Sequence, residues 1–306
     1  MRVAIVGAGA LGSVYGARLA RFASCEVSVV ARAPAPPNAL RLERIEDGEV
    51  LRWEVPARVT ATPPDADVVL AFVRYEQLET LAERVSPGAA PVVVMTPMLP
   101  EDHARLATAL PGRVLTGMPG VVSYENDARA IRYWMPQAAT TLVEERAAPG
   151  ASDAAAELVK RLVRADLRAA LAPDVLARNV ATTVSFVPLA MALDLAGSID
   201  ALLGDHELLS LAFDAAGEGR ELGRAVGKAE AWASTLLRFV GPFSFKMGIG
   251  LARSRAPEAV AYVEEHFGRK LHAQNVAMSR RIVALAAERG TPHEALARLM
   301  QRLQPA

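Results

Sequence analysis

Three glycines near the start of the chain have the spacing that lets a backbone turn hold phosphate groups. They occur in the segment Gly7-Ala8-Gly9-Ala10-Leu11-Gly12. In such a loop the first glycine permits a tight turn, the second lets backbone approach a pyrophosphate, and the third lets a helix pack closely on a strand. The amides at the start of that helix then point at the phosphates. We therefore predict that residues 7–12 bind a dinucleotide.

A second chemical signal is Arg32, which directly follows the apolar segment 26–31. Proteins that bind NAD usually place Asp or Glu at this point, where the carboxylate accepts a hydrogen bond from the ribose 2′-hydroxyl. An arginine instead offers a planar cation that suits a 2′-phosphate. The sequence therefore predicts NADP(H) as the cofactor.

The segments around these residues have the pattern that the motif requires. Residues 2–6 form a short apolar run typical of a buried parallel strand, residues 10–22 have a helical pattern, and residues 26–31 read as a second strand. Together they predict one βαβ unit at the N-terminus of a Rossmann domain, which is the context that gives the glycine motif its meaning.

The rest of the first half also alternates strands and helices. Asp47-Gly48 predicts a β-hairpin with strands at 40–46 and 49–58. We further expect buried strands at 68–73, 91–95 and 113–116, antiparallel segments near 119–124, 129–134 and 139–143, and helices at 76–84, 101–110 and 152–163.

The second half shows only helical periodicity, and no strand pattern is expected after Pro173. Apolar residues recur at three- and four-residue spacings in six segments: 174–195, 206–226, 230–239, 256–266, 268–289 and 292–303. The predicted fold is therefore an α/β Rossmann domain over residues 1–168 and an all-α domain over residues 169–306. Apolar residues at 232–240 suit either a dimer face or the core.

Composition excludes several functional classes. The chain has 306 residues with 34 basic and 34 acidic side chains, so no charge excess favours nucleic acid or a membrane surface. Cys25 is the single cysteine, which excludes an internal disulfide and a cysteine metal cluster. No signal peptide is recognised, and the apolar runs look too short to span a bilayer. We expect a cytoplasmic protein without a metal, which acts on a small molecule, and the sequence is compatible with a homodimer.

The chain resembles the ketopantoate reductase (2-dehydropantoate 2-reductase) family over most of its architecture, and most closely in sequence in its first forty residues. The likeness is carried by Arg2 through Gly12, by Arg32 followed by Pro34, and by the helical second half. It implies a two-domain architecture like that of 6-phosphogluconate dehydrogenase, with the active site between the domains. It also implies reduction of a 2-keto acid to a 2-hydroxy acid with NADPH.

The family's cofactor-side positions can be carried over one by one. Members have a lysine after a buried central strand, and the matching residue here is Arg74, which keeps the positive charge. An asparagine-glycine pair after the next strand falls on Thr96-Pro97. The resemblance thus implies that Arg74 and Thr96 belong to the cofactor site.

The family's catalytic positions are changed. Its lysine general acid aligns with Asn179, its two following asparagines with Thr183 and Val187, and its substrate-binding glutamate with Gln274. A lysine can give a proton to a developing alkoxide, whereas an asparagine amide can only hydrogen-bond to it. We therefore expect a substrate other than ketopantoate, with Asn179, Thr183 and Gln274 in the site.

Another group must then supply the proton if catalysis is retained. Lys270 lies four residues before Gln274 and is expected on the same helix face; Lys246 and His272 are further candidates, and Ser185 shares a helix with Asn179. The rival interpretation is a binding module that holds NADP(H) without catalysis. A weaker one is an opine-type or 3-hydroxyacyl-type dehydrogenase. These need a catalytic histidine, and no recognisable motif surrounds His103, His206, His266, His272 or His293.

Overall fold

The structure is a computed structural model, and it describes residues 1–303 except 87, 127, 138, 146–150, 228–240 and 256. The expected helix at 230–239 and the apolar segment 232–240 lie outside these residues. The chain divides into two compact units, residues Met1–Leu176 and Ala177–Ala306. The first is an α/β unit and the second is helical, in agreement with the predicted fold class.

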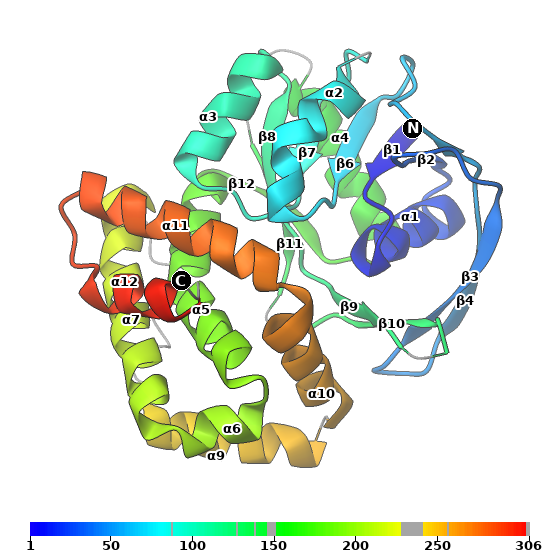
Figure 1. Cartoon of the computed structure of the whole chain (residues 1–306). Coiled ribbons are helices and arrows are strands. Elements are labelled where there is room, and N and C mark those ends of the chain that lie inside the picture. The colour runs from blue at the N-terminus through cyan, green and yellow to red at the C-terminus, as the bar shows by residue number, and fades with distance from the viewer. Residues whose placement is uncertain are drawn as a thin grey trace. The chain divides into compact units, whose positions relative to one another are not determined.

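An eight-stranded sheet forms the centre of the first unit, in the order β12-β11-β8-β7-β6-β1-β2-β5 (Figure 1). Its strands are β1 (Arg2–Val6), β2 (Glu26–Val30), β5 (Arg58–Val59), β6 (Val68–Ala71), β7 (Val92–Val94), β8 (Val114–Met118), β11 (Thr141–Glu144) and β12 (Ala169–Ala172). Six adjacent strands of this sheet pair in parallel, in the spatial order β5-β2-β1-β6-β7-β8. Numbered along the chain, they follow the dinucleotide-binding order 3-2-1-4-5-6.

Strand β12 places the unit boundary later than the sequence predicted. It pairs in parallel with β11, with Thr141 opposite Ala169, so residues 169–172 belong to the sheet rather than to the helical unit. Its sequence, Ala-Ala-Leu-Ala, has no β-branched or aromatic residue and favours a helix by propensity. Pairing with β11 overrides that preference.

A second sheet has four strands in the order β4-β3-β10-β9. Its strands are β3 (Asn38–Arg44), β4 (Val50–Val55), β9 (Val122–Glu125) and β10 (Ile131–Trp134). The hairpin predicted around Asp47-Gly48 is confirmed, since β3 and β4 pair antiparallel. Its second strand ends at Val55 rather than residue 58. Pro56 follows and cannot donate to a ladder, and Arg58–Val59 pairs with β2 in the large sheet instead.

Helix α1 (Ala10–Phe22) is buried on all sides, with eight consecutive buried residues from Gly12 to Leu19. Side chains of both sheets and of α1 belong to one apolar core. At Gly16 an added Cβ would lie 2.7 Å from the ring of Trp53 in β4. The helix that begins at the glycine motif is therefore held rigidly by its surroundings.

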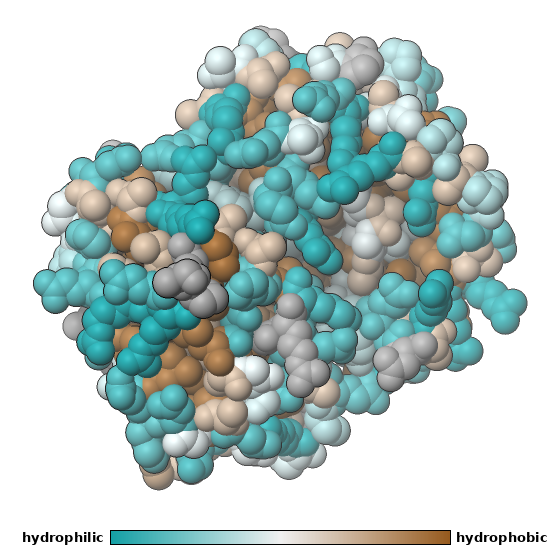
Figure 2. Space-filling model, viewed as in Figure 1, coloured by the Kyte–Doolittle hydropathy of each residue, from teal (hydrophilic) through white to brown (hydrophobic). Residues whose placement is uncertain are grey.

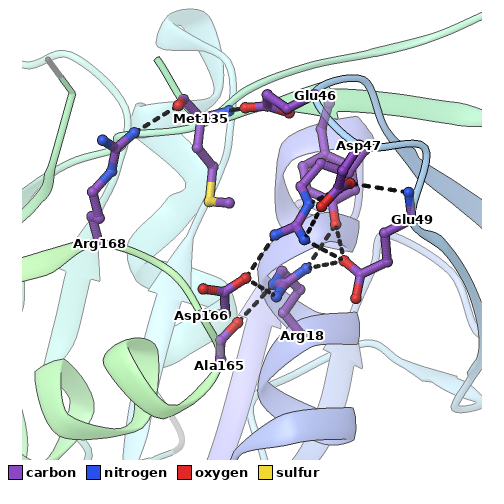
Figure 3. A network of polar contacts seen from close by, with 10 residues as sticks. Arg18, Glu46, Asp47, Glu49, Met135, Ala165, Asp166 and Arg168 are labelled. Atoms are coloured by element: carbon purple, nitrogen blue, oxygen red, sulfur yellow. Dashed lines mark hydrogen bonds and ion pairs between the residues drawn. The ribbon is translucent and has the colours of Figure 1, made fainter. Parts of the chain in front are cut away.

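A buried arginine ties α1 to distant parts of the first unit (Figure 3). Arg18 is 1% exposed and donates hydrogen bonds to the carbonyl of Ala165, the hydroxyl of Tyr133 and the carboxylates of Glu49 and Asp166. The donor–acceptor distances lie between 2.6 and 2.9 Å. A buried guanidinium requires such complete pairing.

The same network reaches the tip of the hairpin. Arg44 donates to Asp166 at 2.6 Å and also binds Asp47 through two nitrogens. These hydrogen bonds, followed by one from the backbone amide of Glu49, lower the pKa of Asp47 to about 2. The hairpin tip is thus fixed to the segment that leads into β12.

The helices of the first unit partly follow the prediction. Besides α1 they are α2 (Leu81–Val85), α3 (Pro100–Ala109) and α4 (Ala151–Arg164). The single helix expected at 76–84 is instead a 3₁₀-helix, Tyr75–Thr80, followed by the short α2.

The second unit contains α-helices and one π-helical segment among its described residues. They are α5 (Val175–Ala196, which starts in the first unit), α6 (Ile199–Gly204), α7 (His206–Gly227), α9 (Pro242–Arg255), α10 (Pro257–Glu265), the π-helix His266–Lys270, α11 (His272–Glu288) and α12 (Glu294–Leu303). Helices α6 and α9 were not expected. The long helix predicted at 268–289 is divided, because a π-helix and a turn at Leu271 precede α11.

Helices α5 and α7 pack with their backbones close together. A Cβ on Gly219 would lie 1.9 Å from the carbonyl oxygen of Val184, and one on Gly227 would lie 2.8 Å from that of Ala177. Gly223, midway between them, faces Ala181. Glycines every four residues therefore let α7 approach α5. Figure 2 shows apolar surface in the region of these two helices.

Helix α5 is long and apolar enough to cross a membrane by length and composition, contrary to the expectation from the apolar runs. Its most apolar window has a mean hydropathy of 1.4, and 56% of that window is buried inside the structure. Core helices of globular proteins pass the same test, and the polar side chains of Asn179, Thr183 and Ser185 interrupt this one.

Candidate dinucleotide-binding site

The turn after β1 needs glycine at two of its three positions. Gly7 has φ +88°, and a Cβ there would lie 2.3 Å from the carbonyl oxygen of Phe72. A Cβ on Gly12 would lie 2.3 Å from the carbonyl oxygen of Gly7. These two glycines are therefore required by the protein's own packing, as the motif predicts.

Gly9 differs from both of its partners in the motif. It is exposed, and a Cβ placed on it would meet no atom within 4 Å. Its backbone is in the extended region, φ −72° and ψ −169°, which any residue can adopt. No contact among the described residues therefore requires glycine here, whereas close approach of a ligand to the backbone would.

The N-terminus of α1 begins at this open position. Gly9 is the N-cap, it provides no side-chain acceptor, and the first turn contains no acidic residue. The first amides of a helix have no acceptor within it, and the helix dipole favours negative charge there. A phosphate beside Ala8, Ala10 and Leu11 would supply both the hydrogen-bond acceptors and the negative charge.

Strand order places the turn at the point where ligands bind in open α/β sheets. β1 lies between β2 and β6, and the connection leaving β1 leads to one side of the sheet while later strands extend the other. Ligands in such sheets bind beyond the carboxyl ends of the strands at this switch. Gly7, Arg32 and Arg74 all follow the carboxyl ends of the three adjacent strands.

Two cations are available at this edge. Arg32 follows β2 and Arg74 follows β6 by three residues, and both side chains are exposed. Neither guanidinium forms a hydrogen bond or an ion pair with another described residue. This contrasts with Arg18, whose donors are all used within the protein. Arg32 and Arg74 are therefore free to bind anionic groups of a ligand.

Thr96 lies at the end of β7 and is 4% exposed. Its hydroxyl donates to the carbonyl of Val73 at 2.5 Å. The side chain thus fixes the loop that carries Arg74, and its proton is used within the protein. Its predicted place beside the cofactor stays a prediction.

The catalytic candidates on α5 lie on one helix face. Asn179 and Thr183 are four residues apart and are 4% and 7% exposed. Ser185 has another role, because its hydroxyl donates to the carbonyl of Ala181, one turn earlier in the helix, at 2.7 Å. The hydroxyl of Ser185 therefore has its hydrogen-bond partner within α5.

Lys270 and Gln274 do not share a regular helix. Lys270 ends the π-helix, α11 starts at His272, and Gln274 is half-buried within α11. The four-residue spacing that suggested a common face therefore does not apply. Lys270 also forms an ion pair with Glu265 at 2.7 Å. Lys246 is exposed on α9, beside a hollow of about 360 Å³ that Arg253 also lines.

A buried carboxylate orients His272, which sequence reasoning did not foresee. Asp194, at the end of α5, has a side chain only 7% exposed. Its Oδ2 lies 3.0 Å from Nδ1 of His272 and accepts a hydrogen bond of 3.0 Å from Nδ2 of the buried Asn275. His272 itself is 55% exposed. The one signal in the sequence was an acidic residue, Asp194, near the end of a largely apolar helix.

No group of three or more His, Cys, Asp or Glu that could hold a metal occurs among the described residues. Cys25 is buried and unpaired. In the part of the chain that the structure describes, the features that favour a ligand are therefore the glycine turn and the two free arginines.

The segment that carries the glycine turn is similar to a known family. A sequence model described as "Ketopantoate reductase PanE/ApbA" matches residues 3–118. This match covers β1 to β8 with the glycine turn, Arg32, Arg74 and Thr96. Residues 3–118 are therefore similar in sequence to that family. Comparison with curated proteins gives no significant match.

Solved structures extend the likeness in fold to both units. A 2-dehydropantoate 2-reductase from Geobacter metallireducens is 21% identical, with a TM-score of 0.73 and 99% of each chain covered. A dimeric ketopantoate reductase from Staphylococcus aureus is 12% identical, with a TM-score of 0.71 and coverage of 99% and 97%. A D-mandelate dehydrogenase, solved with NADH and anilino(oxo)acetate, is 15% identical, with a TM-score of 0.68 over the same shares.

Proposed function

We propose that the protein is an NADPH-dependent oxidoreductase that reduces a small 2-keto acid or a related carbonyl compound other than ketopantoate. One observation carries this proposal: the unpaired Arg32 stands at the carboxyl end of β2, beside an exposed glycine turn whose Gly9 the protein's own packing does not require. A 2′-phosphate would pair with Arg32 and a pyrophosphate would lie on the turn.

The cofactor would supply the hydride, and the protein must orient the carbonyl and give its oxygen a proton. Of the three candidate donors outside α5, only His272 has a buried group, Asp194, that fixes the orientation of its ring. A histidine whose ring is oriented by a carboxylate is a common arrangement for proton transfer. Lys270 is already engaged with Glu265.

The α5 candidates and His272 are alternatives rather than partners. Asp194, which holds His272, follows Asn179 by fifteen residues, about 22 Å along a helix. A small substrate cannot contact both. An Asn179→Ala variant and a His272→Gln variant, compared by kcat and KM, decide which end of α5 takes part.

The rival proposal is a binding module that holds NADP(H) without catalysis. It is favoured by the asparagine at position 179 and by the ion pair of Lys270. The two proposals differ in one measurement, the loss of NADPH absorbance in the presence of a panel of 2-keto acids. Turnover with any of them supports the reductase. Tight NADPH binding with no turnover across the panel supports the binding module, and absence of NADPH binding contradicts both.

We also propose that the protein acts as a homodimer in the cytoplasm. The Staphylococcus aureus protein of similar fold is dimeric. The single cysteine is buried and unpaired, which suits a reducing compartment. Sedimentation of the purified protein tests the first statement, and fractionation of the producing cells tests the second.

A further inference from the structure

Helix α9 exposes a row of large apolar side chains. Phe243, Met247 and Leu251 are 77%, 63% and 53% exposed. They are four residues apart and therefore lie along one side of the helix. No residue of α9 is buried. A contiguous apolar strip of this kind marks an interaction surface.

A shallow groove of small residues runs beside this ridge. Ser244 and Gly248 each follow a ridge residue by one position and are exposed. A Cβ added to Gly248 would meet no atom within 4 Å. Glycine inside a helix is unfavourable relative to alanine, and the packing of the described residues gives no reason for it here. Close approach of another backbone would give one.

Small residues at four-residue spacing also occur inside the second unit, where they contact another helix. Gly219, Gly223 and Gly227 of α7 are also four residues apart, and at each of them a Cβ would contact the backbone of α5. There the small residues let two helices approach closely. On α9 the small residues face outward.

The occupant that fits this face is a second copy of the chain. Ridge and groove lie side by side on one helix, so a two-fold axis places the ridge of each copy in the groove of the other. The charged residue in line with the ridge is Arg255, which lies at its C-terminal end, four residues after Leu251. Lys246 and Arg253 line the hollow toward α6, where Arg253 pairs with Asp200 at 2.6 Å.

We propose that the α9 face, formed by Phe243, Ser244, Met247, Gly248 and Leu251, is the centre of a two-fold interface between two copies of this chain. The exposed parts of three side chains from each copy supply only the centre of such a contact. A stable interface buries about 1,200–2,000 Å². Neighbouring residues must add to the contact, and the dimer should dissociate on dilution.

Sedimentation velocity across a dilution series tests the proposal. The wild-type protein should pass from monomer to dimer as its concentration rises. Met247→Lys places a charge in the ridge and Gly248→Leu fills the groove, so both variants should remain monomeric at concentrations where the wild type is dimeric. Val163→Lys is the matched control, because Val163 is 56% exposed on α4 of the first unit; it should dimerise like the wild type.

A covalent test does not depend on the folding of those variants. Cys25 is buried, so Met247→Cys adds one exposed thiol at the middle of the ridge. Mild oxidation should give a disulfide-linked dimer with Met247→Cys and none with Val163→Cys. A wild-type protein that is monomeric throughout, α9 variants that still dimerise, or equal cross-linking of both cysteine variants would overturn the proposal. So would a lower melting temperature of dilute Met247→Lys monomer, since the face would then be covered by its own chain.

Discussion

A Cβ atom on Gly7 would lie 2.3 Å from the carbonyl oxygen of Phe72, which shows that the turn after β1 and the chain leaving β6 are in direct backbone contact. The amide of Phe72 also donates to the carbonyl of Val6 at 2.7 Å. The two loops of the proposed phosphate site are therefore one packed unit. Gly9, two residues further on, contacts nothing from its Cβ position.

Within this motif, Gly7 is therefore expected to be needed for folding and Gly9 for ligand binding. Gly7→Ala should destabilise the protein, because the residue has φ +88° and its methyl group would meet Phe72. A side chain in such a conformation costs roughly 1–3 kcal/mol, before the steric clash is added. Gly9→Val should leave the free energy of unfolding nearly unchanged and abolish binding of both NADPH and NADH. Urea unfolding and a fluorescence titration measure the two effects. If Gly9→Val still binds, the loop is only a turn.

Arg32 should decide the choice between the two cofactors. Its guanidinium is exposed and unpaired among the described residues, so Arg32→Ala removes a partner of the 2′-phosphate without breaking a contact of the fold. We expect NADPH binding to weaken by roughly 1.5–3 kcal/mol, the range for hydrogen bonds to charged groups. NADH binding should hardly change.

Calorimetry with both dinucleotides measures this effect, and Arg52→Ala is a control. Arg52 is an exposed arginine of β4, away from the strand ends that carry the site. Its replacement should leave both affinities as they are. Equal affinity of the wild-type protein for NADPH and NADH would contradict the role given to Arg32.

Much of the first unit could be predicted because its signals are local. The glycine spacing marks β1 and α1, and Asp47-Gly48 marks the turn between β3 and β4. Arg32 and Arg74 could be placed because strand ends fix the positions that follow them. Even so, the sequence did not indicate that Gly9 alone faces open space, since this depends on where the chain after β6 passes.

The features that were missed depend on contacts between distant residues. β12 is a strand only because β11 lies beside it. The π-helix before α11 moved Lys270 out of register with Gln274. Asp194 is seventy-eight residues from His272 along the chain, and only folding brings the two side chains within 3.0 Å of each other. Helical periodicity alone contains none of this information.

Acid should loosen the hairpin tip through Asp47. Arg44 and the amide of Glu49 hold the pKa of this carboxyl at about 2, below its ordinary value of 3.8. A carboxyl whose pKa is lowered by folding stabilises the folded state above its unfolded pKa, and this stabilisation is lost as the pH falls through the folded pKa. The loss should therefore occur between about pH 4 and pH 2.

Melting temperatures of the wild type and of Asp47→Asn across this range test the effect. The variant should be less stable than the wild type at neutral pH, and the difference should shrink as the pH falls. Glu54→Gln, at an exposed position of β4, serves as the control and should keep a constant difference from the wild type. A constant difference for Asp47→Asn as well would show that its pairing with Arg44 adds nothing to stability in solution.

Ketopantoate should be a poor substrate, although NADPH is expected to bind. By resemblance the position of the lysine general acid is Asn179, and proton donation of this kind contributes roughly 10²- to 10⁴-fold to a rate. Asn179 is 4% exposed on α5, next to the buried Thr183 on the same face. Neither side chain can supply a proton as a lysine does. Steady-state oxidation of NADPH with ketopantoate measures the residual activity.

Restoring the lysine tests whether the remainder of the site has also changed. Asn179→Lys alone should not give activity, because Gln274 still replaces the carboxylate that binds the substrate. Burial at position 179 would also disfavour the charged form of the lysine. Asn179→Lys combined with Gln274→Glu should give a trace. Each variant is first checked for NADPH binding, so that a misfolded protein is not scored as inactive. Robust turnover by Asn179→Lys alone would show that the rest of the site still accepts ketopantoate, and it would refute the proposed change of substrate.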